Sequence, residues 1–184
     1  STMNIILADI EIGGAQRKIL MQAPKNGFFY VLDRATGELL SAEKYTRANW
    51  ASHVDLKTGK PVKTDQGWYK DEPKLVMPTL SGGHNWQPMS FNPATGLVYI
   101  PEHNQPMVYK LEEQYNWKPD QYSTAIDYNV MFDFKSIRHQ VKDSTDTIPS
   151  ESLLAWNPVT QKAVWKVTDG APDGGTLSTP GLLF

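Results

Sequence analysis

The sequence predicts an all-β protein, built from antiparallel four-stranded blades of a partial β-propeller with long loops. Residues 28–32 form a run of aromatic and branched side chains, which favours a strand buried on both faces over an amphipathic helix. A turn signal follows at 33–37 and recurs later. The recurrent signals, with Asp or Asn first and Thr fourth, lie at 55–59, 92–96 and 157–161. Hairpins at irregular spacing are typical of repeated four-stranded blades.

The first blade is expected over residues 1–48. Residues 4–12 mix a short apolar run with alternation and predict an outer strand, which Gly13 and Gly14 end. Residues 18–21 predict an inner strand that leads through Pro24 to Lys25. The aromatic strand at 28–32 follows, and its turn returns the chain into a strand at 38–44.

The rest of the chain predicts two further blades within a single segment that covers residues 1–184. The second blade is expected over 49–112, with a hairpin made by 89–92 and 97–100. Residues 113–150 are polar and aromatic, which predicts a long insertion that runs over one face. A last, incomplete blade is expected over 151–184.

Composition excludes several classes of function. The 184 residues include 18 basic and 20 acidic side chains. The resulting net charge of −2 gives no reason to expect nucleic-acid binding. Without cysteine there is no disulfide, no thiolate metal site and no thiol nucleophile. The four histidines lack zinc-like spacing, so no metal site is expected. Neither a signal peptide nor an apolar run long enough for a membrane span is recognised.

Three segments together resemble one family. Residues 25–37, 83–101 and 154–165 are similar to the pyrroloquinoline quinone (PQQ)-dependent alcohol dehydrogenases, and 174–184 resembles the start of a further blade in that family. The resemblance covers nearly the whole chain and is weakest over 110–150. It implies a periplasmic enzyme that oxidises alcohols by hydride transfer to PQQ, with Ca²⁺ beside the cofactor.

Lys25 is the first candidate cofactor-binding residue. A cation beside a reacting carbonyl can stabilise the negative charge that develops there as hydride arrives. Judged by residue type alone, Lys25 is more simply an exposed loop lysine. The resemblance implies that it lies near the propeller axis and donates to the quinone oxygens of PQQ.

Asn85 and Trp86 are the other candidates for binding PQQ. They follow Gly82 and Gly83, and glycines let a backbone approach a ligand closely. Asn85 offers a donor and an acceptor, and Trp86 offers an indole donor and a flat face. Without the resemblance, Asn85 is better explained as a turn residue and Trp86 as a core residue.

The chain lacks what the family needs for turnover. The resemblance implies a catalytic aspartate and Ca²⁺ ligands upstream of the matching region, so no catalytic or metal-binding residue is predicted here. Where many family members carry a tryptophan, this chain has Pro172 and Asp173. Because about three blades cannot close a propeller, open edges predict a homo-oligomer or the remaining blades as partner. We therefore expect a fragment that is inactive alone.

Two other classes of function remain open. A non-catalytic β-propeller-like module for binding or assembly would explain the missing catalytic centre. A carbohydrate-binding surface could be built from Trp50, Trp68 and Trp117, although aromatic side chains of this size more often pack in a core.

Overall fold

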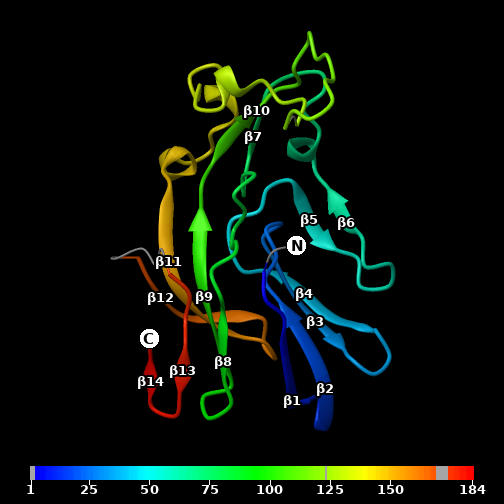
Figure 1. Ribbon diagram of the computed structural model, residues 1–184, viewed down its shortest axis with the longest axis vertical. Coiled ribbons are helices and arrows are strands. Elements are labelled where there is room, and N and C mark those ends of the chain that lie inside the picture. Colours follow the sequence, from blue (N-terminus) through cyan, green and yellow to red (C-terminus); the bar gives the residue numbers. More distant parts are fainter. Residues whose placement is uncertain (1–2, 123, 169–173) are drawn as a thin grey trace.

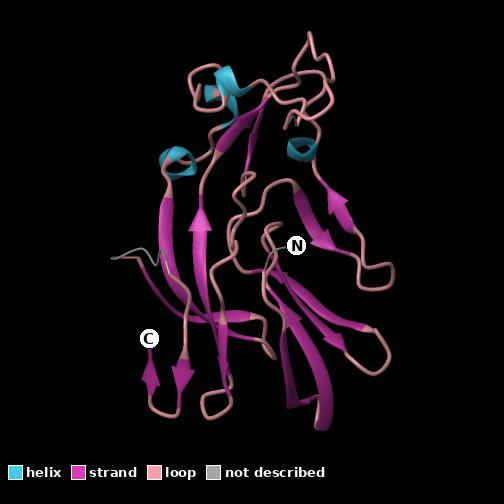
Figure 2. Ribbon diagram, in the orientation of Figure 1, coloured by secondary structure: helices cyan, strands magenta, loops and turns pink. Residues whose placement is uncertain are grey.

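The fold is all-β, as the sequence predicts. The computed structural model describes residues 3–122, 124–168 and 174–184, and Figures 1 and 2 show strands joined by long loops, with short helical turns. Within these ranges the helical turns are all of the 3-10 type, and no α-helix is present. None of these turns is long and apolar enough to cross a membrane.

The first sheet is a meander of four antiparallel strands in chain order. Each strand pairs with the next through a short turn, so the sheet is built from local hairpins. Its strands are β1 (Ile6–Ile12), β2 (Ala15–Gln22), β3 (Phe28–Asp33) and β4 (Leu39–Lys44).

The second four-stranded sheet combines strands from two distant parts of the chain. Its order is β12-β11-β9-β8, and β9 pairs with β11 although the chain makes a long excursion between them. The strands are β8 (Ser90–Asn92), β9 (Leu97–Asn104), β11 (Ser150–Asn157) and β12 (Lys162–Val167). The pairing of β9 with β11 therefore joins the two sides of the segment 113–150 in one sheet.

Smaller elements complete the structure. Three two-stranded sheets are formed by β5 (Ala51–Val54) with β6 (Pro61–Lys63), β7 (Lys74–Val76) with β10 (Met107–Tyr109), and β13 (Ser178–Thr179) with β14 (Leu182–Leu183). The 3-10 turns are η1 (Asp65–Gly67), η2 (Tyr128–Val130), η3 (Arg138–Gln140) and η4 (Ser144–Thr147). In Figure 1, β7 and β10 lie together at the upper end, below the loops that follow β10.

Residues 113–150 pack against the pair β7 and β10. Ile137 is buried in a small cluster with Leu75 and Val108. The Gln140 side chain accepts from the backbone N–H of Leu75 and donates to the carbonyl oxygen of Pro73. Backbone and side-chain contacts therefore hold this segment on the rest of the molecule.

The main core lies between the two four-stranded sheets. Side chains from β2 and β3 meet side chains from β9 and β11, and the rings of Phe29 and Trp156 lie 5.9 Å apart. The amide of Gln161 also donates to the Ser41 hydroxyl across the two sheets, at 2.8 Å. Since each sheet alone would expose this apolar face, the two sheets stabilise each other as neighbouring blades.

All four turn signals have the same geometry. In each turn the side chain of the first residue accepts a hydrogen bond from the backbone N–H two residues later. The backbone carbonyl oxygen of the first residue accepts from the backbone N–H of the fifth. The four first residues are Asp33, Asp55, Asn92 and Asn157. The fifth residue has positive φ even where it is Gln161, with φ of 54°.

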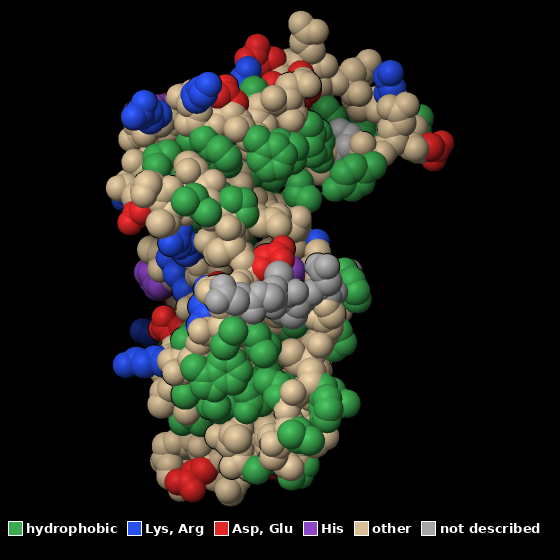
Figure 3. Space-filling model, turned by 90° about the vertical axis from the view of Figure 1, so that its left-hand side faces the viewer, with side chains coloured by type: hydrophobic (Ala, Val, Ile, Leu, Met, Phe, Trp, Pro, Cys, Tyr) green, Lys and Arg blue, Asp and Glu red, His purple; other side chains and the backbone are tan. Residues whose placement is uncertain are grey.

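One side of the molecule carries exposed apolar side chains on β12 and in the closing hairpin of β13 and β14. Figure 3 faces this side and shows hydrophobic side chains gathered over its lower part. The exposed large apolar residues of these segments are Val164, Trp165, Val167, Leu177, Leu182 and Phe184. A patch of this kind usually marks a contact with another protein surface.

Replacing Asp33 tests the turn chemistry. We expect Asp33→Ala to lower the melting temperature, because the carboxylate accepts from the backbone N–H groups of Ala35 and Thr36. Asp33→Asn should keep most of the stability, since Asn92 and Asn157 act in the same way. Thermal unfolding followed by circular dichroism measures both. Equal losses in the two variants would instead assign the effect to the ion pair of Asp33 with Arg17.

Candidate functional site

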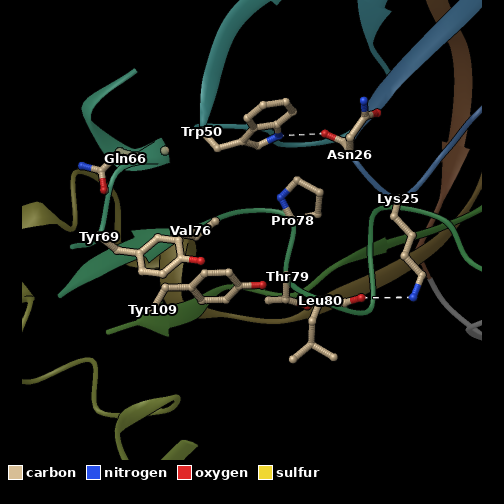
Figure 4. Close-up of a pocket in the computed structure, with 11 residues that line it drawn as sticks. Lys25, Asn26, Trp50, Gln66, Tyr69, Val76, Pro78, Thr79, Leu80 and Tyr109 are labelled. Atoms are coloured by element: carbon tan, nitrogen blue, oxygen red, sulfur yellow. Dashed lines mark hydrogen bonds between the residues drawn. The ribbon is translucent and has the colours of Figure 1, made fainter. Parts of the chain in front are cut away.

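Lys25 lies in the turn between β2 and β3, against residues 79–83. Its ammonium donates to the carbonyl oxygen of Leu80 at 3.1 Å, and its own carbonyl oxygen accepts from the N–H of Gly83 at 3.0 Å. Figure 4 shows the Lys25 side chain extended beside Leu80. The structure thus brings Lys25 to the segment that leads into Asn85 and Trp86.

Two glycines permit this close approach. Gly82 has φ of +86°, and a Cβ on it would lie 2.7 Å from the Lys25 Cα. A Cβ on Gly83 would lie 2.4 Å from Cγ2 of Thr46. A side chain at either position would push the two segments apart, because real Cβ atoms do not approach heavy atoms so closely.

Strand β9 extends the same backbone connection. The carbonyl oxygen of Gly83 accepts from the N–H of His103 at 2.8 Å, so Gly83 bridges the Lys25 turn and the end of β9. Beside it, the buried carboxylate of Glu102 accepts from the Ser152 hydroxyl and pairs with Lys166 at 2.5 Å. Opposite charge and hydrogen bonding offset the cost of burying this carboxylate.

Tyr45 closes the back of the site as a hydrogen-bond donor. Its hydroxyl donates to the carbonyl oxygen of Pro24 at 2.8 Å. Burial raises the pKa of Tyr45 well above its usual value, and the negative charge of Glu102 raises it further. The phenol therefore stays protonated and holds the chain just before Lys25.

His84 fixes the loop that carries Asn85 and Trp86. The imidazole is fully buried, with Nδ1 2.8 Å from the Ala23 carbonyl oxygen and Nε2 2.6 Å from the Gln87 carbonyl oxygen. The ring therefore spans the start of the Lys25 turn and the residue after Trp86. Burial lowers the pKa of His84, and the two carbonyl contacts oppose that shift without reversing it.

Asn85 and Trp86 lie on the outer side of this loop. Asn85 is half-buried, whereas Trp86 has 63% of its surface exposed. Trp86 is therefore not the core residue that its type alone would suggest. The closing segment reaches the same loop, since the N–H of Thr176 donates to the Pro88 carbonyl oxygen at 2.7 Å. Pro172 and Asp173 lie outside the described residues.

A pocket of about 360 Å³ opens on the other side of Lys25. Figure 4 shows Trp50, Tyr69 and Tyr109 around it, together with Pro78 and Val76. Asn85 and Trp86 are not among the residues that line it. Of the three tryptophans considered for carbohydrate, Trp50 is half-buried in this pocket, while Trp68 and Trp117 are exposed.

Sequence reasoning missed the polar groups behind the site. His84, Tyr45 and the Glu102–Lys166 pair act through contacts between distant segments, so no local spacing marks them. The one available signal is the adjacent carboxylate and imidazole of Glu102 and His103, which follow the strand predicted at 97–100. In the described part of the chain, no group of three or more His, Cys, Asp or Glu side chains could hold a metal ion.

The chain matches quinohemoprotein alcohol dehydrogenases along its length. It is 48% identical over 187 residues to quinohemoprotein alcohol dehydrogenase ADH IIB of Pseudomonas putida, covering all of this chain and 25% of the relative. The identity to the 1-butanol dehydrogenase (cytochrome c) of Thauera butanivorans is 39%, over 98% of this chain and 26% of the relative. The chain thus spans about a quarter of the length of these curated relatives. No family model matches the chain.

Solved structures agree with the sequence relatives. The quinohemoprotein alcohol dehydrogenase ADHIIG of Pseudomonas putida HK5 superimposes with a TM-score of 0.81 at 40% identity, over 99% of this chain and 27% of that structure. A europium-containing methanol dehydrogenase gives a TM-score of 0.72 at 27% identity, over 92% of this chain and 28% of that structure. These neighbours confirm the fold expected from the sequence, a part of a β-propeller.

A pair of glycine variants tests the close approach at Lys25. Gly37→Ala should cost about 1 to 2 kcal/mol, because Gly37 has a similar φ of +79° and open space around it. Gly82→Ala should cost about 1 to 3 kcal/mol more, because its Cβ would overlap Lys25. Urea unfolding of both variants measures the difference. Equal costs would show that the contact between the two segments tolerates a methyl group.

The buried imidazole predicts a dependence of stability on pH. The folded-state pKa of His84 lies below its ordinary value of 6.5. Its contribution to the free energy of unfolding is therefore complete above pH 6.5. It is lost as the pH falls through 6.5 toward the lower folded pKa, where the unfolded chain binds the proton first. We expect His84→Gln to reduce the fall of melting temperature on acidification, with His53→Gln, at an exposed position, as the control. An unchanged slope in His84→Gln would contradict this assignment.

Proposed function

The chain belongs to the quinoprotein alcohol dehydrogenase family, of whose members it spans about a quarter, and on that premise we propose that it forms one wall of a PQQ site in an alcohol-oxidising enzyme. The observation that carries the proposal is the meeting of Lys25 with the loop of Gly82 and Gly83 that leads into Asn85 and Trp86. These are the positions that the family resemblance assigns to PQQ.

The donor groups at this wall suit an anionic quinone. The Lys25 ammonium uses one of its three N–H donors in the hydrogen bond to the Leu80 carbonyl oxygen, so the two others can bind an oxygen ligand. The exposed indole of Trp86 offers an N–H and a flat surface. Nearby, the buried Oγ1 of Thr46 and Nε2 of His103 have no hydrogen-bond partner within the described residues. Such unsatisfied groups are expected where a ligand completes the site.

The residues of this wall would have two roles, binding the cofactor and stabilising charge on it. When bound, PQQ would accept the hydride removed from the alcohol. Lys25 would hold a quinone oxygen and stabilise the negative charge that develops on it. Asn85 and Trp86 would orient the cofactor, and His84 would keep their loop in register with Lys25 through its contact with Ala23.

We propose further that this chain alone does not turn over alcohol. The family resemblance assigns the catalytic aspartate and the Ca²⁺ ligands to a part of the relatives that this chain does not span. Lys25, Asn85 and Trp86 would then supply cofactor contacts without a general base to accept the alcohol proton. A periplasmic location follows from the same resemblance.

The exposed apolar side chains of β12, β13 and β14 support the proposal that this chain has a partner. In a propeller each blade packs its face on the next, so we propose that this side contacts the remaining blades or a second copy of the chain. The same surface favours the alternative function, a non-catalytic β-propeller-like module for binding or assembly. Binding of PQQ distinguishes the two functions.

Titration with PQQ tests the proposal. We expect quenching of tryptophan fluorescence to saturate, and Lys25→Ala to weaken binding about tenfold or more, as the loss of a charged hydrogen bond predicts. Lys57→Ala, which removes an exposed lysine from the turn between β5 and β6, should bind like the unchanged chain. Alcohol oxidation with PQQ and Ca²⁺ should stay at background. Unsaturable quenching, or equal binding by Lys25→Ala, would favour the non-catalytic module.

A further inference from the structure

The turn that carries Lys25 is held through its backbone carbonyl oxygens. It connects β2 to β3, and its successive carbonyl oxygens from Pro24 to Gly27 accept hydrogen bonds from other segments. The Tyr45 hydroxyl donates to Pro24 at 2.8 Å, the N–H of Gly83 to Lys25 at 3.0 Å, the indole N–H of Trp50 to Asn26 at 2.9 Å, and the N–H of Tyr45 to Gly27 at 3.0 Å.

The indole of Trp50 is itself fixed by packing. Its ring stands edge-on to Phe28 at 6.0 Å, and Trp50 packs against a buried apolar cluster that contains Phe28, Ala42 and Ala51. The carbonyl oxygen of Trp50 accepts from the N–H of Thr64 at 3.0 Å. Figure 4 shows the indole N–H pointing at the Asn26 carbonyl oxygen. The donor is therefore in place before any ligand binds.

The residue before Trp50 joins this contact to β7. The Asn49 side chain donates to the carbonyl oxygen of Leu75 and accepts from the N–H of Met77, both at 2.8 Å. The N–H of Asn49 also donates to the Met77 carbonyl oxygen, at 3.0 Å. Trp50 thus connects the Lys25 turn to β7, whereas Gly83 connects it to the loop that leads into Asn85.

The Lys25 ammonium needs such support because a lysine side chain is long and flexible. A hydrogen bond to a ligand oxygen weakens outside a narrow range of distance and angle, so binding groups must be held within about 0.5 Å of their place. The bond to the Leu80 carbonyl oxygen fixes the ammonium end of the side chain. Trp50 acts at the other end, on the peptide group directly after Lys25.

We propose that Trp50 is a positioning residue for cofactor binding, which fixes the Lys25 turn through the Asn26 carbonyl oxygen so that the Lys25 ammonium can meet a quinone oxygen. This inference rests on the proposed role of Lys25 in binding PQQ. Trp50 acts through Lys25 and contributes no contact of its own to the cofactor.

A double-mutant cycle tests whether Trp50 acts through Lys25. Trp50→Phe keeps an aromatic ring beside Phe28 but removes the N–H donor. We expect it to weaken PQQ binding, measured by equilibrium dialysis, about three- to tenfold. In the Lys25→Ala background the same change should cause no further loss, because the group that Trp50 positions is absent.

The matched control is Trp68→Phe, which removes the indole donor of an exposed tryptophan that binds Asp71 at 3.1 Å. This variant should bind PQQ like the unchanged chain. The proposal fails if Trp50→Phe binds as tightly as the unchanged chain, or if it weakens binding equally with and without Lys25.

Amide hydrogen exchange without PQQ tests the hold on the turn separately. In Trp50→Phe, the N–H groups of Gly83 and Tyr45 should exchange about five- to tenfold faster, since their acceptors lie in the released turn. The N–H of Gly37, bonded to Asp33 at the far end of β3, should be unaffected. Equal acceleration at Gly37 would assign Trp50 to overall stability and overturn the proposal, as would unchanged exchange at Gly83.

The two measurements separate this inference from the proposed function. Faster exchange at Gly83 in a chain that binds no PQQ would refute the PQQ site and leave Trp50 as the residue that fixes Lys25. If Trp50→Phe does not fold, 3-benzothienylalanine at position 50 takes its place in both measurements, because it keeps the shape of the indole without the N–H.

Discussion

The structure depends on the packing of two four-stranded sheets against each other. Ile19, Met21 and Val31 of the first sheet and Val98 and Ile100 of the second are all fully buried in one apolar cluster. At about 25 cal/mol per Å² of apolar surface, this shared face is the main stabilising contact of the chain. Lys25 follows β2 and His103 lies near the end of β9, so both stand where a strand leaves this core.

The same packing explains why the site is well defined. Lys25 follows β2 and His103 belongs to β9, so the two sheets bring them to the common neighbour Gly83. Loops placed by two rigid sheets can present polar groups precisely enough for recognition, whereas loops alone cannot. The pocket beside Lys25 is held in the same way, because the chain at Asn26, which lines the pocket, leads into β3.

Local signals allowed the first sheet and the turns to be predicted from the sequence. The side chains of Asp33 and Asn92 accept from backbone N–H groups two residues away. The run at 28–32 forms a strand in which its apolar side chains are buried, as their types predict. The pairing of β9 with β11 could not be found in this way, since no pattern of residues states which distant strand is the neighbour. For the same reason the burial of His84 and the exposure of Trp86 are visible only in the folded chain.

The separation of β9 from β11 along the chain has a kinetic consequence. The first sheet closes through short hairpins, which form on the microsecond scale, whereas β9 meets β11 only after the whole excursion has been confined. Closing a long loop costs entropy before any pairing compensates for it. The first sheet is therefore expected to form early and to offer its apolar face as a template, on which the later strands find their register.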